Sequence, residues 1–213
     1  MTVVWDVIVA ERLALADLLD SLSPEEWSRP SLCASWTVHD VAAHMTMQQL
    51  GIADAVGVMR AWQGSMARTT REAARRRAAA RSPAQIVAEI RETAPRHRHS
   101  IGVTKLETLI DVLVHTQDIA LPLGRRHDMP PAAAAAATTR VLTMRWPPPL
   151  PSTRVLTGFR LTATDIDWAH GDGPEVHGPM AALLLVATGR QVALPSLSGE
   201  GAAGLSERLR LSR

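Results

Sequence analysis

The chain has 213 residues, a length that allows one domain or two small ones and excludes a large multidomain assembly. Its composition, 46% hydrophobic and 21% charged, is that of a soluble globular protein and excludes wholesale disorder, collagen-like repeats and a membrane channel. The chain has 23 Lys and Arg residues and 21 Asp and Glu residues, so its net charge is only +2, which indicates no general affinity for nucleic acid.

The single cysteine, Cys33, excludes an intramolecular disulfide framework and favours a reducing compartment. The N-terminus lacks the basic segment of a signal peptide, and the longest apolar run, residues 181–187, is far shorter than the ~20 residues that span a bilayer. We therefore expect a cytoplasmic protein that has no membrane partner.

Helical patterns fill the first part of the chain. Residues 3–21 have helical apolar spacing, with Asp6, Glu11, Arg12 and Asp17 between the apolar positions Val4, Ile8, Leu15, Leu18, Leu19 and Leu22. Capping patterns predict a short helix or turn from Ser23 and a long helix from Thr37 to about Trp62. The arginine-rich residues 64–81 fit a solvated helix or a mobile connection, with an anion-binding patch as the alternative.

Three further helices are predicted by the same signals. One is capped by Ser82 and runs to about His99, and another spans residues 105–120 and ends at Pro122 and Gly124. An alanine-rich helix opens at Pro130 and Pro131 and stops at Trp146.

A proline-rich connector, residues 147–151, is the clearest boundary in the chain, because four prolines in five residues can neither continue a helix nor join a central strand. The alternation of residues 159–168 predicts a strand with a bulge, followed by a turn at residues 171–174 and a hairpin partner near Val176. A short apolar helix then covers residues 179–187. We expect a helical metal-binding domain over residues 1–146 and a small α/β domain over residues 152–213.

One polar stripe in the helix over residues 105–120 contains Asp111, His115 and Asp118 but no Lys, Arg or Glu. Exposure to water is the simple interpretation; burial against other helices is favoured because apolar residues border the stripe on both sides. Asp111 and His115 are spaced four apart, a geometry suited to two ligands of one metal ion. His44, mid-helix among small and apolar residues, is the best third ligand, although such a histidine is also compatible with a simple core position.

At this point the sequence resembles a known family, the mycothiol-dependent maleylpyruvate isomerases of actinobacteria, a branch of the DinB-like four-helix proteins. The resemblance rests on residues 22–27, on residues 33–44 (Cys-Ala-Ser-Trp-Thr-Val-His-Asp-Val-Ala-Ala-His) and on residues 111–124. Residues 165–168, 171–174, 178–179 and 189–190 are similar to the small C-terminal domain of that family. The fold implied is α+β, a DinB-like four-helix bundle followed by a small α/β C-terminal domain.

The resemblance implies a divalent metal held by His44, Asp111 and His115, with mycothiol as the thiol cofactor. The isomerase subgroup has a glutamate where this chain has Asp111; Zn²⁺ is the metal that the family implies, while Fe²⁺ or Ni²⁺ also suits two histidines and a carboxylate. The implied activity is isomerisation of, or thiol transfer to, a small electrophilic substrate.

Other residues have weaker signals. Asp118 and Arg190 are candidate catalytic residues, the first orienting a ligand histidine and the second anchoring an anionic substrate or the thiol. Gln48, one turn after His44, is a candidate cofactor-binding residue alongside Arg190. Cys33 is interpreted as structural, because nothing cationic lies beside it in the sequence to lower its pKa.

Two other functions stay open. The first is a non-catalytic metal- or ligand-binding protein of the same fold, serving stress response or regulation. The second, nucleic-acid binding through arginines 68–81, is disfavoured by the net charge and would show steep salt dependence. The expected partners are therefore a small electrophile and a thiol, with the protein a monomer or homodimer.

Overall fold

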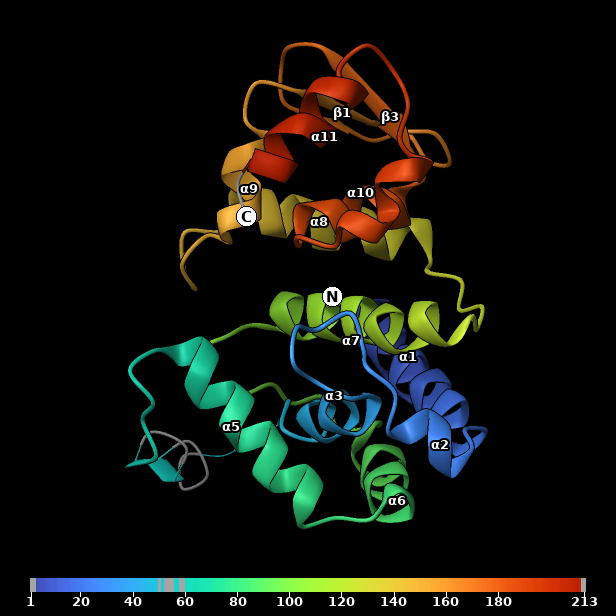
Figure 1. The fold of residues 1–213 in the computed structure, drawn as a ribbon, viewed down its shortest axis with the longest axis vertical. Helices are drawn as coiled ribbons and strands as arrows, with labels where there is room; N and C mark the ends of the chain where they lie inside the picture. The colour runs from blue at the N-terminus through green and yellow to red at the C-terminus, as the bar shows by residue number, and fades with distance from the viewer. Residues whose placement is uncertain (1–2, 50, 52–55, 58–59, 212–213) are drawn as a thin grey trace. The chain divides into compact units, whose positions relative to one another are not determined.

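The computed structural model describes residues 3–49, 51, 56–57 and 60–211. The chain is mostly helical with one three-stranded sheet, the α+β class predicted from the sequence (Figure 1). It divides into two compact units, Met1–His127 and Asp128–Arg213. None of the helices that the structure describes combines the length and the apolar character needed to cross a bilayer.

The elements that the structure describes in the first unit are all helical. They are α1 (Val3–Asp20), α2 (Pro24–Trp27), α3 (Val38–Met45), α5 (Met66–Ala79), α6 (Pro83–Thr93) and α7 (Lys105–Ala120), with a 3₁₀ turn at Leu121–Leu123. In the core, α1 packs on α6 and α7, and α3 packs on α5 and α7.

Helix α1 buries polar as well as apolar side chains. Its buried stripe contains Ile8, Leu15 and Leu19, as the apolar spacing predicts, and also Glu11 and Arg12 between them. The sequence pattern places these two charged residues between the apolar positions; in the structure they lie at the i+3 and i+4 positions from Ile8 and share its face. The core of this unit therefore contains an acid and a base.

The predicted N-terminal caps are confirmed. Ser23, Thr37 and Ser82 each accept a hydrogen bond from the backbone of the third helical residue in a capping box. Three predicted C-termini are wrong, one of them in the alanine-rich helix, which ends at Thr143 and not at Trp146. Helix α3 ends at Met45, because the chain turns at residues 46–49; of the rest of the helix predicted to Trp62, residues 50, 52–55 and 58–59 lie outside the described residues. Helix α6 ends at Thr93 and not at His99, since Pro95 has no N–H to continue it.

The second unit contains helices on a small sheet. Its elements are α8 (Pro131–Thr143), α9 (Pro151–Leu156), β1 (Arg160–Ala163), β2 (Ala169–His170), β3 (Glu175–Gly178), α10 (Met180–Ala187), a 3₁₀ helix (Gln191–Ser196) and α11 (Ala202–Leu211). Helix α8, which the sequence analysis places in the helical domain, packs on α10. The unit therefore starts at Asp128, before the boundary expected at residue 146.

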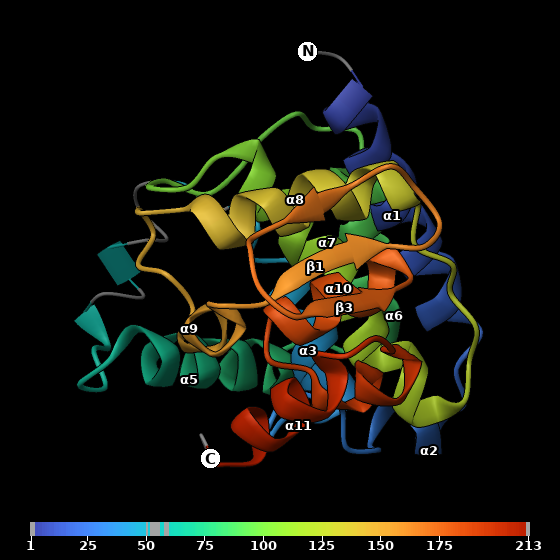
Figure 2. The ribbon, with the colours of Figure 1, turned by 90° about the horizontal axis from the view of Figure 1, so that it is seen from above.

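The sheet has the order β2-β1-β3, so the hairpin predicted between residues 168 and 176 is wrong. Strand β2 is antiparallel to β1, whereas β3 is parallel to β1, with Leu161 opposite Val176 (Figure 2). The turn at residues 171–174 carries the chain across the start of β1 to its other edge. A Cβ at Gly173 would lie 2.3 Å from the carbonyl oxygen of Gly158, so this crossing requires glycine.

Candidate active site

A tight loop, residues 30–37, connects α2 to α3. An antiparallel bridge between Pro30 and Thr37 closes it, and the Ser31 hydroxyl donates to the carbonyl of Trp36 at 2.9 Å. The backbone N–H of Leu32 donates to the carbonyl of Asp118 at 3.1 Å, which ties the loop to α7. The loop therefore holds the side chains of Cys33 and Trp36 against that helix.

Helix α7 is buried on almost every side, as its polar stripe predicts. Between Glu107 and Ala120, Asp111 and His115 are the two positions that stay partly exposed, and all the others are buried. Because these two are four residues apart, they share one strip of the helix surface. Asp118, on the next turn, is fully buried.

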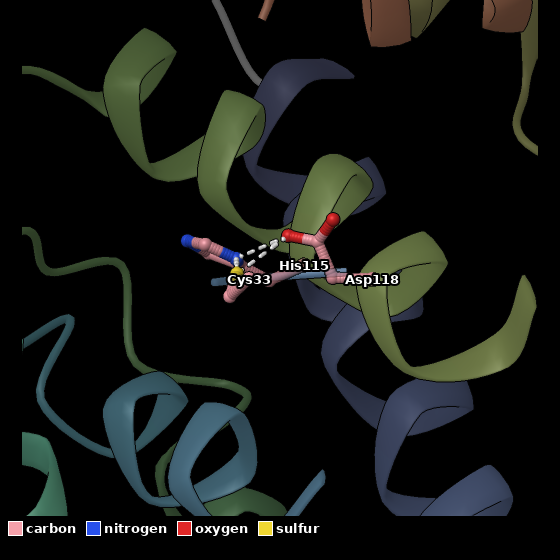
Figure 3. Close-up of side chains that lie close together, drawn as sticks. All are labelled: Cys33, His115 and Asp118. Atoms are coloured by element: carbon pink, nitrogen blue, oxygen red, sulfur yellow. Dashed lines mark hydrogen bonds and ion pairs between the residues drawn. The ribbon is translucent and has the colours of Figure 1, made fainter. Parts of the chain in front are cut away.

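Cys33, His115 and Asp118 form one compact cluster (Figure 3). The Oδ2 atom of Asp118 lies 2.8 Å from Nδ1 of His115 and accepts a hydrogen bond from the Cys33 thiol at 3.0 Å. The Cys33 sulfur lies 3.6 Å from the same ring nitrogen. Figure 3 shows the other ring nitrogen of His115 pointing away from Asp118 and Cys33. Nε2 of His115 is thus the ring nitrogen left for another partner.

The spacing within this cluster is that of hydrogen bonds. Two ligands of a tetrahedral Zn²⁺, with bonds of about 2.0–2.3 Å, lie roughly 3.3–3.8 Å apart. The separations of 2.8 and 3.0 Å to the Asp118 oxygen are shorter than that. The three side chains have donor types that a metal accepts, but their arrangement here is that of a carboxylate supporting a histidine from behind.

His44 of α3 lies beside His115. Their ring centroids are 5.0 Å apart in an edge-to-face arrangement, and Trp36 packs against His44 at 5.3 Å. Two imidazoles bound to one tetrahedral metal ion at about 2.0–2.1 Å place their centroids about 5 Å apart. Nδ1 of His44 is buried and has no hydrogen-bond partner among the described residues. The two imidazoles therefore have a spacing and a donor type that fit two ligands of one divalent metal.

The two imidazoles differ in charge. Burial, together with the nearby charge of His115, lowers the pKa of His44 to about 3, so His44 is neutral at physiological pH. Burial also disfavours the charged form of His115, but the hydrogen bonds of its Nδ1 with Asp118 and Cys33 outweigh this effect and raise its pKa. Without a metal, His115 is an imidazolium paired with the Asp118 carboxylate.

The predicted ligand set is only partly brought together. In the part of the chain that the structure describes, Cys33, His115 and Asp118 are the one group of three such side chains whose potential ligand atoms all lie within 4.8 Å. Asp111 shares the exposed strip with His115 but does not complete a group of this kind with His44 and His115. The assignment of His44, Asp111 and His115 as metal ligands stays a prediction.

Comparison with known proteins gives a family match for part of this unit. Residues 8–102 match the model of the mycothiol maleylpyruvate isomerase N-terminal domain. These residues belong to that family. The matched segment includes Cys33, Trp36 and His44, and α7 follows it in the same unit of the structure.

The fold of the whole chain also agrees with this family. Two solved structures match it, the mycothiol-dependent maleylpyruvate isomerase (TM-score 0.55) and a histidine-to-alanine mutant of that protein (TM-score 0.56). Each is 16% identical, and the match covers 91% of this chain and 93% of that chain. The chain thus shares the overall α+β fold of these structures, as the sequence motifs imply. No curated protein matches it in sequence.

Sequence reasoning missed the contact of Cys33 with the histidine and the carboxylate, which lie 82 and 85 residues further along the chain. The available signal was its place in the segment that resembles the mycothiol maleylpyruvate isomerase family. Gln48 accepts a hydrogen bond from Arg12 at 3.2 Å, and Arg190 donates to the carbonyl of Thr188 at 2.7 Å. The roles predicted for these two residues and for Asp118 in catalysis stay predictions.

Proposed function

We propose that the protein is a divalent-metal-dependent enzyme that uses mycothiol to isomerise, or to transfer its sulfur to, a small electrophilic substrate. The observation that supports this most directly is the pair of His44 and His115, 5.0 Å apart, in which Asp118 holds Nδ1 of His115 and leaves Nε2 available. His44, His115 and Asp111 would hold the metal. Zn²⁺ is the first metal to test, because the donor set of two imidazoles and a carboxylate suits it and leaves an open position.

A bound divalent metal would lower the pKa of a coordinated thiol and polarise a substrate carbonyl. A free thiol of pKa ~8.5 is only a few per cent ionised at pH 7, so full ionisation raises the thiolate fraction at most ~30-fold, about 2 kcal/mol. Most of the rate enhancement must therefore come from positioning thiol and substrate together.

The residues around the metal have separate tasks in this proposal. Asp118 accepts the Nδ1 proton of His115, fixes its tautomer and orients the ring. Trp36 packs beside both rings, with centroid distances of 5.3 Å to His44 and 6.4 Å to His115, and restricts their rotation. Arg190 remains the proposed anchor for an anionic substrate or the thiol.

Isomerase and transferase chemistry differ in the fate of the thiol. In the first, the mycothiol thiolate adds to an activated carbon–carbon double bond, the resulting single bond rotates, and the thiolate leaves, so the thiol is regenerated. In the second, the thiolate displaces a leaving group or opens an electrophile and stays attached to it.

The experiment incubates Zn²⁺-loaded protein with mycothiol and maleylpyruvate, and separately with alkylating electrophiles, while product and free thiol are measured. Isomer formed without thiol loss indicates the isomerase, and thiol loss with adduct formation indicates the transferase. His44→Ala should remove either activity, whereas Asp6→Asn, on the exposed face of α1, should remove neither.

A non-catalytic metal- or ligand-binding protein of the same fold is the second candidate, and the low identity of 16% to the solved isomerase structures favours it. Metal binding at one ion per chain without turnover of any of these substrates would support this candidate and contradict the enzyme.

A further inference from the structure

Arg12 is a cation in the interior of the first unit. It lies in the buried stripe of α1 with only 3% of its surface exposed, between Ile8 and Leu15. Arginine is rarely buried to this extent unless a partner satisfies its charge. The neighbouring acid, Glu11, is engaged elsewhere, since its carboxylate accepts from Nε2 of His127 at 2.8 Å.

The guanidinium of Arg12 has neutral hydrogen-bond partners and one buried nitrogen that no described residue satisfies. Nε donates to the side-chain oxygen of Gln48 at 3.2 Å, and a terminal nitrogen donates to the carbonyl of Arg96 at 3.2 Å. The other terminal nitrogen is buried without a hydrogen-bond partner. Among the described residues no carboxylate forms an ion pair with Arg12.

This arrangement is costly for the protein alone. Burial lowers the pKa of Arg12 to about 10, which still leaves the side chain charged at physiological pH. A buried N–H group without an acceptor destabilises the folded protein, and a buried charge without a counter-ion destabilises it more. One anionic acceptor beside the unsatisfied nitrogen would reduce both destabilising effects.

We propose that Arg12 and Gln48 form an internal binding site for the carboxylate of a small organic acid. A carboxylate carries the single negative charge that neutralises one guanidinium, whereas a phosphate dianion would leave an excess charge in the interior. Gln48 can add a second donor, because its amide nitrogen has only a weak contact, to the sulfur of Met45 at 3.8 Å, among the described residues. This binding requires neither metal nor thiol, so it goes beyond the proposed function.

The test is thermal denaturation of the metal-free protein at pH 7.5 and constant ionic strength, with acetate or maleate as the probe and chloride or phosphate as controls. Carboxylates should raise the melting temperature with increasing concentration, by about 5 °C or more at one hundred times Kd. Arg12→Met should abolish the response, while Arg98→Met, at an exposed position, should retain it.

Three outcomes would overturn the proposal. The first is a wild-type melting temperature that does not change with carboxylate, which means that water or the chain itself satisfies the guanidinium. The second is an equal rise of the melting temperature with every anion. The third is a full carboxylate-dependent rise in Arg12→Met. If Arg12→Met fails to fold, Gln48→Met replaces it. The apparent carboxylate affinity of Gln48→Met should then be at least tenfold lower than that of wild type, and an unchanged affinity would contradict the site. A chelator keeps the protein free of metal during this test. The result is therefore independent of the isomerase or transferase activity, which requires the metal.

Discussion

The Oδ2 atom of Asp118 lies 2.8 Å from Nδ1 of His115, one turn earlier on the same helix. A carboxylate in this position fixes the tautomer of a metal-binding histidine and raises its basicity. The interaction is inside the protein, since Asp118 is fully buried. It therefore sets both the orientation of His115 and its protonation state.

Asp118→Asn should weaken Zn²⁺ binding by about 10- to 100-fold, because an amide neither orients nor polarises the imidazole as a carboxylate does. Competition with a chromophoric chelator measures this affinity. Asp6→Asn, which changes an exposed acid by the same atoms, is the matched control. Equal Zn²⁺ affinity in both variants would contradict the role assigned to Asp118.

Cys33→Ala should keep about one Zn²⁺ per chain, because the thiol donates a hydrogen bond to Asp118 and the two separations to the Asp118 oxygen are too short for a pair of metal ligands. His115→Ala should lose the metal. Elemental analysis of both purified variants gives the occupancies. Loss of Zn²⁺ from Cys33→Ala would instead make the sulfur a ligand.

Zn²⁺ binding at pH 7 should release about one proton per chain. The raised pKa keeps His115 protonated in the metal-free protein, and that proton must leave before Nε2 binds a metal, whereas His44 is already neutral. Apparent affinity should thus fall about tenfold for each unit by which pH decreases. Calorimetry in buffers of different ionisation enthalpy counts the protons. A count of zero would show that His115 is neutral before binding or is not a ligand.

The metal-free protein should lose stability as pH falls from about 6.5 towards 3. His44 has a folded-state pKa of about 3, so in this window the unfolded chain binds a proton there that the folded chain does not. His115 has the opposite sign: its raised pKa stabilises the fold fully below pH 6.5, and this contribution is lost at higher pH. Urea titrations at a series of pH values give the free energy of unfolding of wild type and His44→Gln. Below pH 6, the slope of this free energy against pH should be smaller in the variant, by an amount that corresponds to about one proton. Identical slopes would contradict the burial of a neutral imidazole.

Asp111→Glu should bind Zn²⁺ at least as tightly as wild type, and Asp111→Leu should bind it more weakly by tenfold or more. The extra methylene extends the carboxylate from the strip that it shares with His115. Chelator competition again gives both affinities. If Asp111→Leu binds like wild type, the third ligand is another group.

The elements that local chemistry determines were predictable. Ser23, Thr37 and Ser82 start helices because their hydroxyl groups satisfy free backbone N–H groups a few residues away. The pairing of β3 with β1 was not predictable, because a parallel register depends on where a crossing loop carries the chain and not on the alternation of residues within a strand.

In the candidate site, too, local features were predictable from the sequence and long-range contacts were not. The spacing of Asp111 and His115 indicated one shared strip of α7, and the small and apolar neighbours of His44 indicated the third ligand before the family resemblance supported it. The contact of Cys33 with Asp118 joins residues 85 positions apart, and no local pattern encodes it. The burial of Arg12 could not be predicted, because the sequence pattern does not distinguish a charged residue in the core from one that borders an apolar stripe.

The thiol of Cys33 also gives this protein an internal reporter. It is the single sulfhydryl of the chain, and its hydrogen bond to Asp118 exists only when the loop at residues 30–37 lies against α7. The rate at which a small alkylating reagent labels it therefore follows the docking of that loop, without any introduced probe. Opening of the loop can be timed in the native protein by mass spectrometry alone.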